Sequence, residues 1–258
     1  MDTNEKVVLV TNSQDYAGPP AVLSLLEAGF RVLAHDRSFV NDDSWQRFRS
    51  VAPGAERIVG DTANAIIDTA WQIHGRIDAL VSNDHYPAVH KAPTEVAPDD
   101  LLATLQNLVV FPFDLIRTAV PRFDAQGTGN IVMITSCRTR LPMYGGAVPD
   151  AARAAANALV RSLAIDLASK HIAVNAVAPN FLYSEAYYPR SLFIDNPIGR
   201  QYVESEVPVG RLGQWGELGE LIVFLASTQA RFLTGSIIDF AGAWPVAKAR
   251  PDSTSVRS

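Results

Sequence analysis

The chain of 258 residues contains a single cysteine, Cys137, and lacks both a basic run and a long apolar run. One cysteine excludes an internal disulfide and fits a reducing compartment. Without an apolar amino-terminal segment or about 18 consecutive apolar residues, neither secretion nor a membrane span is indicated. The net charge of -5, with no basic patch, argues against nucleic acid as a partner. We therefore expect a cytoplasmic protein that binds a small molecule or anion.

Metal-ligand spacing is also missing from the sequence, so we expect no metal site. The histidines that show no such spacing are His35, His74, His85, His90 and His171.

Short β-branched runs alternate with stretches of helical period along the chain. The first run, "KVVLVT", is apolar almost throughout, as is typical of a strand buried on both faces. Later runs are "RVLAHD", "RIDALVSND", "GNIVMITS", "IAVNAVAPN" and "GSIIDFAG". This alternation predicts an α/β fold, a single-domain Rossmann-type doubly wound parallel sheet. We expect one domain over residues 1–250 and a polar, disordered tail over residues 251–258.

Glycine is scarce in the turn after the first strand, "TNSQDYAG". A dinucleotide site needs glycines there so that the backbone can approach the pyrophosphate, yet only Gly18 is present. Asn12 and Tyr16 stand where the other two glycines would be. A phenol at Tyr16 would fill the phosphate volume, which favours a small anion at the helix start. The alternative is a decayed dinucleotide turn in which Tyr16 only packs. Asp36 lies where an acid would hold a ribose, although an aspartate after a strand is more often a turn former.

Ser136 ends the run "GNIVMITS", and Arg153 lies on the next predicted helix. Pro149 precedes Arg153 by four residues, which places both on one helix face. A proton acceptor would be wanted at this place, and proline has no ionisable group.

Two stretches resemble the short-chain dehydrogenase/reductase superfamily: "GRIDALVSND" and the carboxyl-terminal "GRLGQWGELGELIVFLASTQARFLTGSIIDFAGAW". Within it, "TNSQDYAGPPAV", "AHDRSF", "VSND" and "APNFLYSEAYYP" are similar to the halohydrin dehalogenases. That resemblance implies a site that has lost the nicotinamide cofactor and binds a halide in the vacated space. It also implies release of halide from vicinal haloalcohols to give epoxides.

The resemblance further implies a Ser-Tyr-Arg catalytic set, in which Ser136 and Arg153 match and the tyrosine position falls on Pro149. Tyr144, in a glycine-rich loop five residues earlier, is the candidate for a replacement base. The implied halide site consists of Tyr16, Pro179, Asn180, Phe181, Leu182 and Tyr188. The implied substrate pocket adds Asn12, Asp84 and Tyr187.

Three functions stay open from the sequence. The first is a cofactor-independent, halohydrin dehalogenase-like lyase impaired by Pro149. The second is a noncatalytic homologue that binds a ligand or serves as an oligomer partner. The third is an NAD- or NADP-dependent oxidoreductase, which the missing glycines and the missing Tyr-x-x-x-Lys pattern oppose. The superfamily resemblance also implies a homo-oligomer, a tetramer or dimer.

Overall fold

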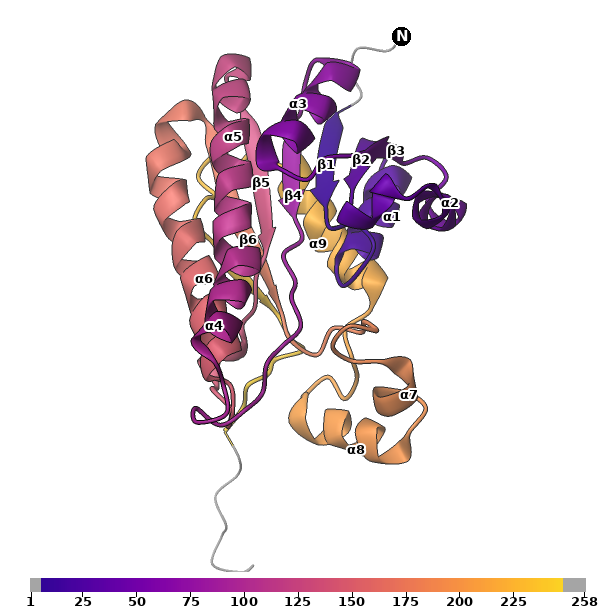
Figure 1. Ribbon diagram of the computed structural model, residues 1–258, viewed down its shortest axis with the longest axis vertical. Helices are drawn as coiled ribbons and strands as arrows, with labels where there is room; N and C mark the ends of the chain where they lie inside the picture. The colour runs from indigo at the N-terminus through magenta and orange to yellow at the C-terminus, as the bar shows by residue number, and fades with distance from the viewer. Residues whose placement is uncertain (1–5, 248–258) are drawn as a thin grey trace, which may run out of the picture.

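The structure, a computed structural model, describes residues 6–247, so the tail expected at residues 251–258 lies outside the described residues. One parallel sheet has the strand order β3-β2-β1-β4-β5-β6-β7 (Figure 1). Its strands are β1 (Val7–Thr11), β2 (Arg31–His35), β3 (Glu56–Ile58), β4 (Ala79–Ser82), β5 (Gly129–Ile134), β6 (Ile172–Pro179) and β7 (Ile237–Phe240). The α/β Rossmann-type fold expected from the sequence is therefore confirmed. Each quoted apolar run contains a strand, and only β3 had no counterpart among them.

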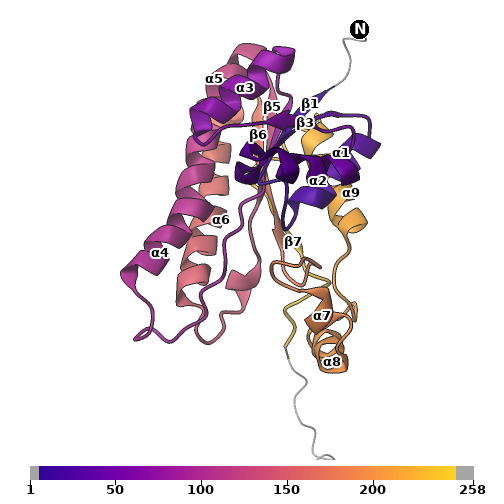
Figure 2. The same cartoon turned by 45° about the vertical axis from the view of Figure 1, so that its right-hand side comes forward.

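Helices cover both faces of the sheet. One face carries α1 (Gly18–Glu27), α2 (Asp42–Val51) and α9 (Trp215–Ser227). The other face carries α3 (Ala63–His74), α5 (Phe111–Gln126) and α6 (Ala147–Leu167). Beyond the carboxyl edge of the sheet lie α7 (Arg190–Phe193) and α8 (Pro197–Glu206), whereas α4 (Pro98–Leu105) lies on the other side of the molecule and packs against α6, as Figure 2 shows.

The apolar strand residues form two cores because successive side chains of a strand point to opposite faces. Val8 and Val10 of β1 pack on the α1–α9 side, whereas Val7 and Leu9 pack on the α3–α5 side. All four are buried, which explains why the run is apolar without interruption.

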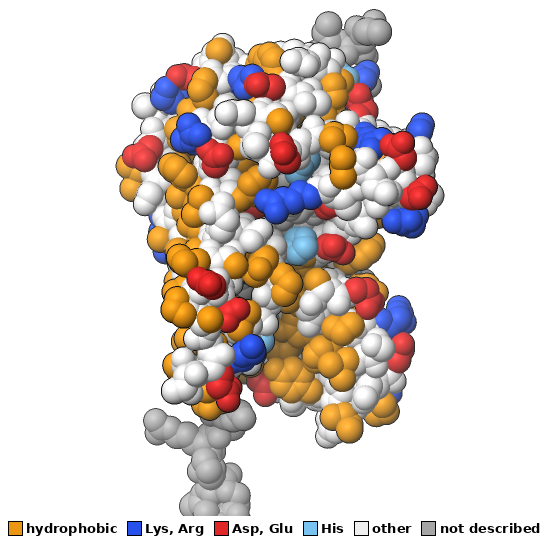
Figure 3. Space-filling model, viewed as in Figure 1, with side chains coloured by type: hydrophobic (Ala, Val, Ile, Leu, Met, Phe, Trp, Pro, Cys, Tyr) orange, Lys and Arg blue, Asp and Glu red, His pale blue; other side chains and the backbone are white. Residues whose placement is uncertain are grey.

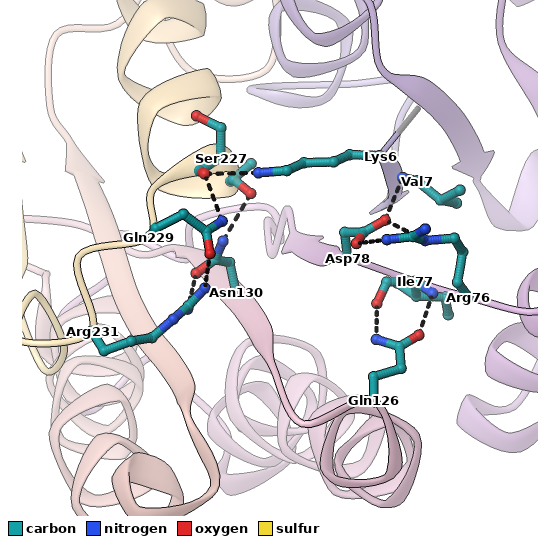
Figure 4. Close-up of polar contacts among 11 residues, drawn as sticks. Lys6, Val7, Arg76, Ile77, Asp78, Gln126, Asn130, Ser227, Gln229 and Arg231 are labelled. Atoms are coloured by element: carbon teal, nitrogen blue, oxygen red, sulfur yellow. Dashed lines mark hydrogen bonds and ion pairs between the residues drawn. The ribbon is translucent and has the colours of Figure 1, made fainter. Parts of the chain in front are cut away.

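Polar contacts tie the elements together at the amino edge of the sheet (Figure 4). The Asp78 carboxylate accepts a hydrogen bond from the Val7 amide at 2.8 Å. Gln126 of α5 binds the amide of Ile77 at 3.1 Å and its carbonyl at 2.8 Å. Asn130 of β5 donates to the carbonyl of Ala226 in α9 at 2.9 Å. Side-chain hydrogen bonds thus stabilise the amino edge, and the loops that follow the strands lie at the carboxyl edge.

Within residues 6–247, no helix has both the length and the apolar character needed to cross a membrane. The same part of the chain holds no group of three or more His, Cys, Asp or Glu side chains able to ligate a metal ion.

Candidate functional site

A cavity of about 400 Å³ lies at the carboxyl edge of the sheet. Figure 3 shows the hollow between the sheet and the α7–α8 segment, with apolar side chains around it. Ten residues singled out in the sequence line this cavity: Tyr16, Ser136, Pro149, Arg153, Pro179, Asn180, Phe181, Leu182, Tyr187 and Tyr188. Parallel strands end at one edge, which explains how loops distant in sequence meet here. Asn12, Asp84 and Tyr144 are not among the lining residues.

The first turn is built from non-glycine residues in a conformation that favours glycine. Asn12 and Tyr16 have φ values of 50° and 58°. Asn83, after β4, donates from its side-chain amide to the carbonyls of Asn12 at 2.7 Å and Asp15 at 2.9 Å. Asn12 in turn donates to the Asn83 carbonyl at 3.0 Å. Asn12 therefore links the turn to β4 and does not face the cavity.

Tyr16 forms a wall of the cavity. It is 8% exposed, and its ring meets that of Tyr187 edge to face, with 5.0 Å between centroids. Burial raises the pKa of the Tyr16 hydroxyl, and the nearby charge of Arg153 opposes only part of this rise. The Tyr16 phenol is therefore held more firmly in its protonated form than the phenol of an exposed tyrosine.

The residues of this turn do not fit a nicotinamide dinucleotide. The Tyr16 ring is buried within the turn where the pyrophosphate would lie. The Asp36 carboxylate already accepts from the Ser38 amide at 2.9 Å and the Gln14 amide at 3.2 Å. Gly18 has no room for a side chain, since a Cβ would lie 2.5 Å from the Ser13 carbonyl oxygen. The turn is thus packed against itself and leaves no cradle for phosphates.

Ser136 lies just beyond β5, on the cavity wall. Its hydroxyl donates to the Pro179 carbonyl at 3.1 Å and accepts from the Arg138 amide at 3.2 Å. Asn157 of α6 donates to the Ser136 carbonyl at 3.0 Å. The sequence interpretation missed Asn157, although its spacing of four from Arg153 places both on one helix face. Ser136 is held rigidly, with its proton directed at β6.

Arg153 is a cation that is 6% exposed. Its Nη1 donates to the backbone carbonyls of Asp84 at 2.9 Å and Ile134 at 3.4 Å. No carboxylate in residues 6–247 forms an ion pair with it. A buried cation with only main-chain partners attracts an anion into the cavity that it lines.

Asp84 lies behind Arg153 and is 1% exposed. Its Oδ1 accepts from the Ser82 hydroxyl at 3.1 Å, while Oδ2 has no partner in the described chain. Burial raises the pKa of this carboxyl to about 7, although the Ser82 hydrogen bond and the charge of Arg153 oppose the rise. The structure thus places Asp84 beneath the cavity wall instead of in the pocket that the sequence suggested.

Pro149 lies in the first turn of α6, buried, and lines the cavity in the place where the base was expected. Tyr144 is 89% exposed and does not line the cavity. The structure therefore does not bring the candidate replacement base to Ser136.

The loop after β6 is folded around Asn180. The Asn180 Oδ1 accepts from the Phe181 amide at 3.1 Å and from the Tyr188 hydroxyl at 2.9 Å. The Asn180 amide donates to the Phe240 carbonyl at 3.1 Å. Phe181 has a φ of 55° and is 3% exposed. Two of the amides expected to hold a halide are thus already occupied.

Among the backbone amides of Asn180, Phe181 and Leu182, that of Leu182 has no acceptor in the described chain. Leu182 pairs in parallel with Gly213, whose amide donates to the Phe181 carbonyl at 2.8 Å and whose carbonyl accepts from the Tyr183 amide at 3.1 Å. In this pairing the Leu182 N–H points away from Gly213. Within residues 6–247 it has no acceptor, and Leu182 lines the cavity. A free amide and a buried guanidinium that line one cavity suit a small anion.

The chain is similar to known proteins in both sequence and structure. Residues 22–242 match a family model described as Enoyl-(Acyl carrier protein) reductase. An uncharacterized oxidoreductase of Thermotoga maritima is 32% identical over 247 residues, covering 94% of this chain and 98% of that protein. A structure titled "Dehalogenation enzyme" is 36% identical, with a TM-score of 0.90 over 95% of this chain and 100% of the other. The halohydrin dehalogenase HheC, solved with ethyl (2S)-oxiran-2-ylacetate, is 31% identical, with a TM-score of 0.92 over 96% and 100%.

Proposed function

Because this chain belongs to the short-chain dehydrogenase/reductase superfamily, we propose that its cavity is a halohydrin dehalogenase-like site. Such a site holds a small anion and a vicinal haloalcohol, or the matching epoxide, without a nicotinamide cofactor. One observation carries the proposal: Ser136, the unpaired Arg153 and the free Leu182 amide line a single cavity, with Tyr16 filling the turn where phosphates would bind. The two similar dehalogenase structures support it.

The proposed reaction is an internal displacement. The hydroxyl oxygen of the haloalcohol forms a bond to the neighbouring carbon, the carbon–halogen bond breaks, and the halide leaves with the bonding electrons. Ser136 turns its hydroxyl from the Pro179 carbonyl to the substrate oxygen, and the charge of Arg153 stabilises the developing alkoxide. The Leu182 amide and the aromatic edge of Tyr16 receive the halide.

Removal of the hydroxyl proton is the slow part of the proposed reaction. Pro149 offers no proton acceptor, so the proton passes to water. Loss of a general base typically lowers the rate by about 10²–10⁴-fold. We therefore propose that the wild-type chain converts haloalcohols slowly.

A noncatalytic homologue is the second candidate. Pro149 on the cavity wall favours it, and so does the hydrogen bond that the Ser136 hydroxyl donates to the Pro179 carbonyl. In this case the cavity binds the same anion and ligand, with no turnover above the rate in buffer.

Bromide release from 1-bromopropan-2-ol tests the proposal, with the wild type compared with Pro149→Tyr. We expect Pro149→Tyr to be about 100-fold faster than wild type, since it regains a base on the face that carries Arg153. Adding Ser136→Ala should abolish this gain, whereas adding Tyr144→Phe should leave it unchanged because Tyr144 faces solvent.

The outcomes separate the candidates. Measurable wild-type release identifies a slow lyase. Release by Pro149→Tyr alone identifies a noncatalytic homologue with an intact pocket. If both proteins are folded but inert, and neither binds bromide in a calorimetric titration, the proposal is wrong.

A further inference from the structure

Arg138 places a second guanidinium on the cavity wall, two residues after Ser136. It begins the short 3-10 helix Arg138–Arg140, and its side chain is 18% exposed. Its Nε forms an ion pair with Asp150, whose side chain is 16% exposed. The sequence interpretation did not single out Arg138, because nothing local shows that it turns toward the cavity.

The guanidinium of Arg138 keeps unused donors. Asp150 takes only Nε. Nη2 is buried without an acceptor in the described chain, and Nη1 makes no hydrogen bond there either. Leaving a buried donor without an acceptor is destabilising, and more so for a charged group. As the side chain stands, a guest in the cavity would bring its acceptor to Nη1, and it would satisfy Nη2 as well if the side chain turned toward the cavity.

The charges of the two arginines act on different tyrosines of the cavity lining. The charge of Arg138 opposes part of the rise that burial causes in the pKa of Tyr188. The charge of Arg153 does the same for the pKa of Tyr16. Among the lining residues of the described chain, Arg138 and Arg153 are cations and Glu206 is the one carboxylate, while Asp150, which pairs with Arg138, does not line the cavity.

We infer that Arg138 selects ligands that carry a carboxylate next to the hydroxyl-bearing carbon, that is, 2-hydroxy acids and the matching epoxy acids. This inference rests on the proposed function, which places the ligand hydroxyl at Ser136. Because Arg138 follows Ser136 by two residues and lines the same cavity, a carboxylate close to that hydroxyl can reach its fork. A planar guanidinium binds a carboxylate in a two-pronged geometry that a neutral substituent cannot match.

The cavity size agrees with this ligand class. About 400 Å³ lies at the small end of the range for ligand pockets, roughly 300–1,000 Å³. The halide site at Leu182 and the carboxylate site at Arg138 would then hold two separate negative charges, with Ser136 on the wall that they share.

A matched pair of unreactive probes tests the inference: lactate, and propane-1,2-diol, which has a hydroxymethyl group in place of the carboxylate. We expect calorimetry of the wild type to show lactate binding about tenfold more tightly than the diol. Arg138→Met should reduce this preference to about twofold or less. Arg140→Met is the control, because Arg140 is on the same 3-10 helix, pairs with Asp239 and does not line the cavity.

Thermal melts establish whether each variant is folded. If Arg138→Met does not fold, Arg138→Lys replaces it in the binding measurements. A lysine keeps the charge but loses the fork, so part of the preference should remain. The inference is overturned if the wild type shows no preference for lactate, or if a folded Arg138→Met keeps it.

Bromide competition separates this inference from the proposed function. Saturating bromide should change lactate affinity by no more than about twofold, because bromide is expected at the Leu182 amide and the lactate carboxylate at Arg138. Mutual exclusion would place lactate in the halide site and overturn the role of Arg138. Absence of bromide binding in the wild type would instead contradict the proposed function, whatever lactate does.

Discussion

The Arg153 guanidinium donates from Nη1 to the backbone carbonyl of Asp84, 2.9 Å away, and forms no ion pair with the Asp84 carboxylate. The carboxylate points elsewhere, to the Ser82 hydroxyl. This arrangement fixes Arg153 without neutralising it, so that its charge remains available to the cavity. It also leaves a buried carboxyl that binds its proton unusually tightly.

Asp84 should make the protein less stable as pH rises. Its pKa of about 7 in the folded state exceeds the value of about 4 in an unfolded chain. Between these values the folded state binds more protons, so the free energy of unfolding falls with increasing pH. Between about pH 5 and pH 8 the free energy of unfolding of the wild type should fall by about 2–4 kcal/mol more than that of Asp84→Asn. Urea unfolding across this range measures the difference, and parallel curves for the two proteins would contradict it.

The filled first turn predicts no binding of nicotinamide cofactors. Because Tyr16 is packed against Tyr187, NADH or NADPH would have to displace a buried ring. We expect no change in NADH fluorescence as the wild type is added up to about 1 mM, a concentration at which even millimolar affinity would be detected. A nicotinamide-dependent member of the superfamily is the positive control. A dissociation constant in the micromolar range would show that the turn opens and would restore the oxidoreductase interpretation.

Asn83 should be important for stability. Its side-chain amide satisfies two carbonyls of the first turn, those of Asn12 and Asp15. Asn83→Ala removes both hydrogen bonds at a buried position, which should lower the free energy of unfolding by about 2–4 kcal/mol. Asn107→Ala is the control, because that side chain makes one hydrogen bond within its own helical segment, to the Ala103 carbonyl at 2.9 Å. Equal losses in the two variants would show that the first turn is not held by Asn83.

The fold was predictable from the sequence because parallel strands buried on both faces leave an uninterrupted apolar signal. The exception is β3, which has three residues, of which only Ile58 is fully buried. An edge strand this short is too brief for a period to be recognised.

The site was predictable where a strand end or a helix spacing fixes a residue, and where the resemblance to a known family covers a loop, as for Tyr16 and Tyr188. Ser136 and Arg153 reached the cavity for the first of these reasons. Tyr144 did not, because closeness in sequence does not determine which way a glycine-rich loop turns. Arg138 was missed because its direction depends on Asp150, twelve residues away. The cytoplasmic location and the homo-oligomer stay predictions.

The charge of Arg153 should control proton removal once a base is supplied. A phenol introduced by Pro149→Tyr would lie four residues from Arg153 on the same helix face, and a neighbouring guanidinium lowers the pKa of a phenol. In Pro149→Tyr with Arg153→Met, the pKa read from the pH–rate profile of bromide release should therefore be higher than in Pro149→Tyr by about one unit or more.

Pro149→Tyr with Arg153→Lys separates charge from hydrogen bonding. Lysine keeps the positive charge but cannot reproduce the bonds from Nη1 to the carbonyls of Asp84 and Ile134. Its profile should stay near that of Pro149→Tyr, with a maximal rate about tenfold lower because the cation is less well fixed. Pro149→Tyr with Arg140→Met should match Pro149→Tyr in both respects, since Arg140 pairs with Asp239 outside the cavity. Identical profiles for the methionine variant and its parent would mean that Arg153 acts on the fold alone.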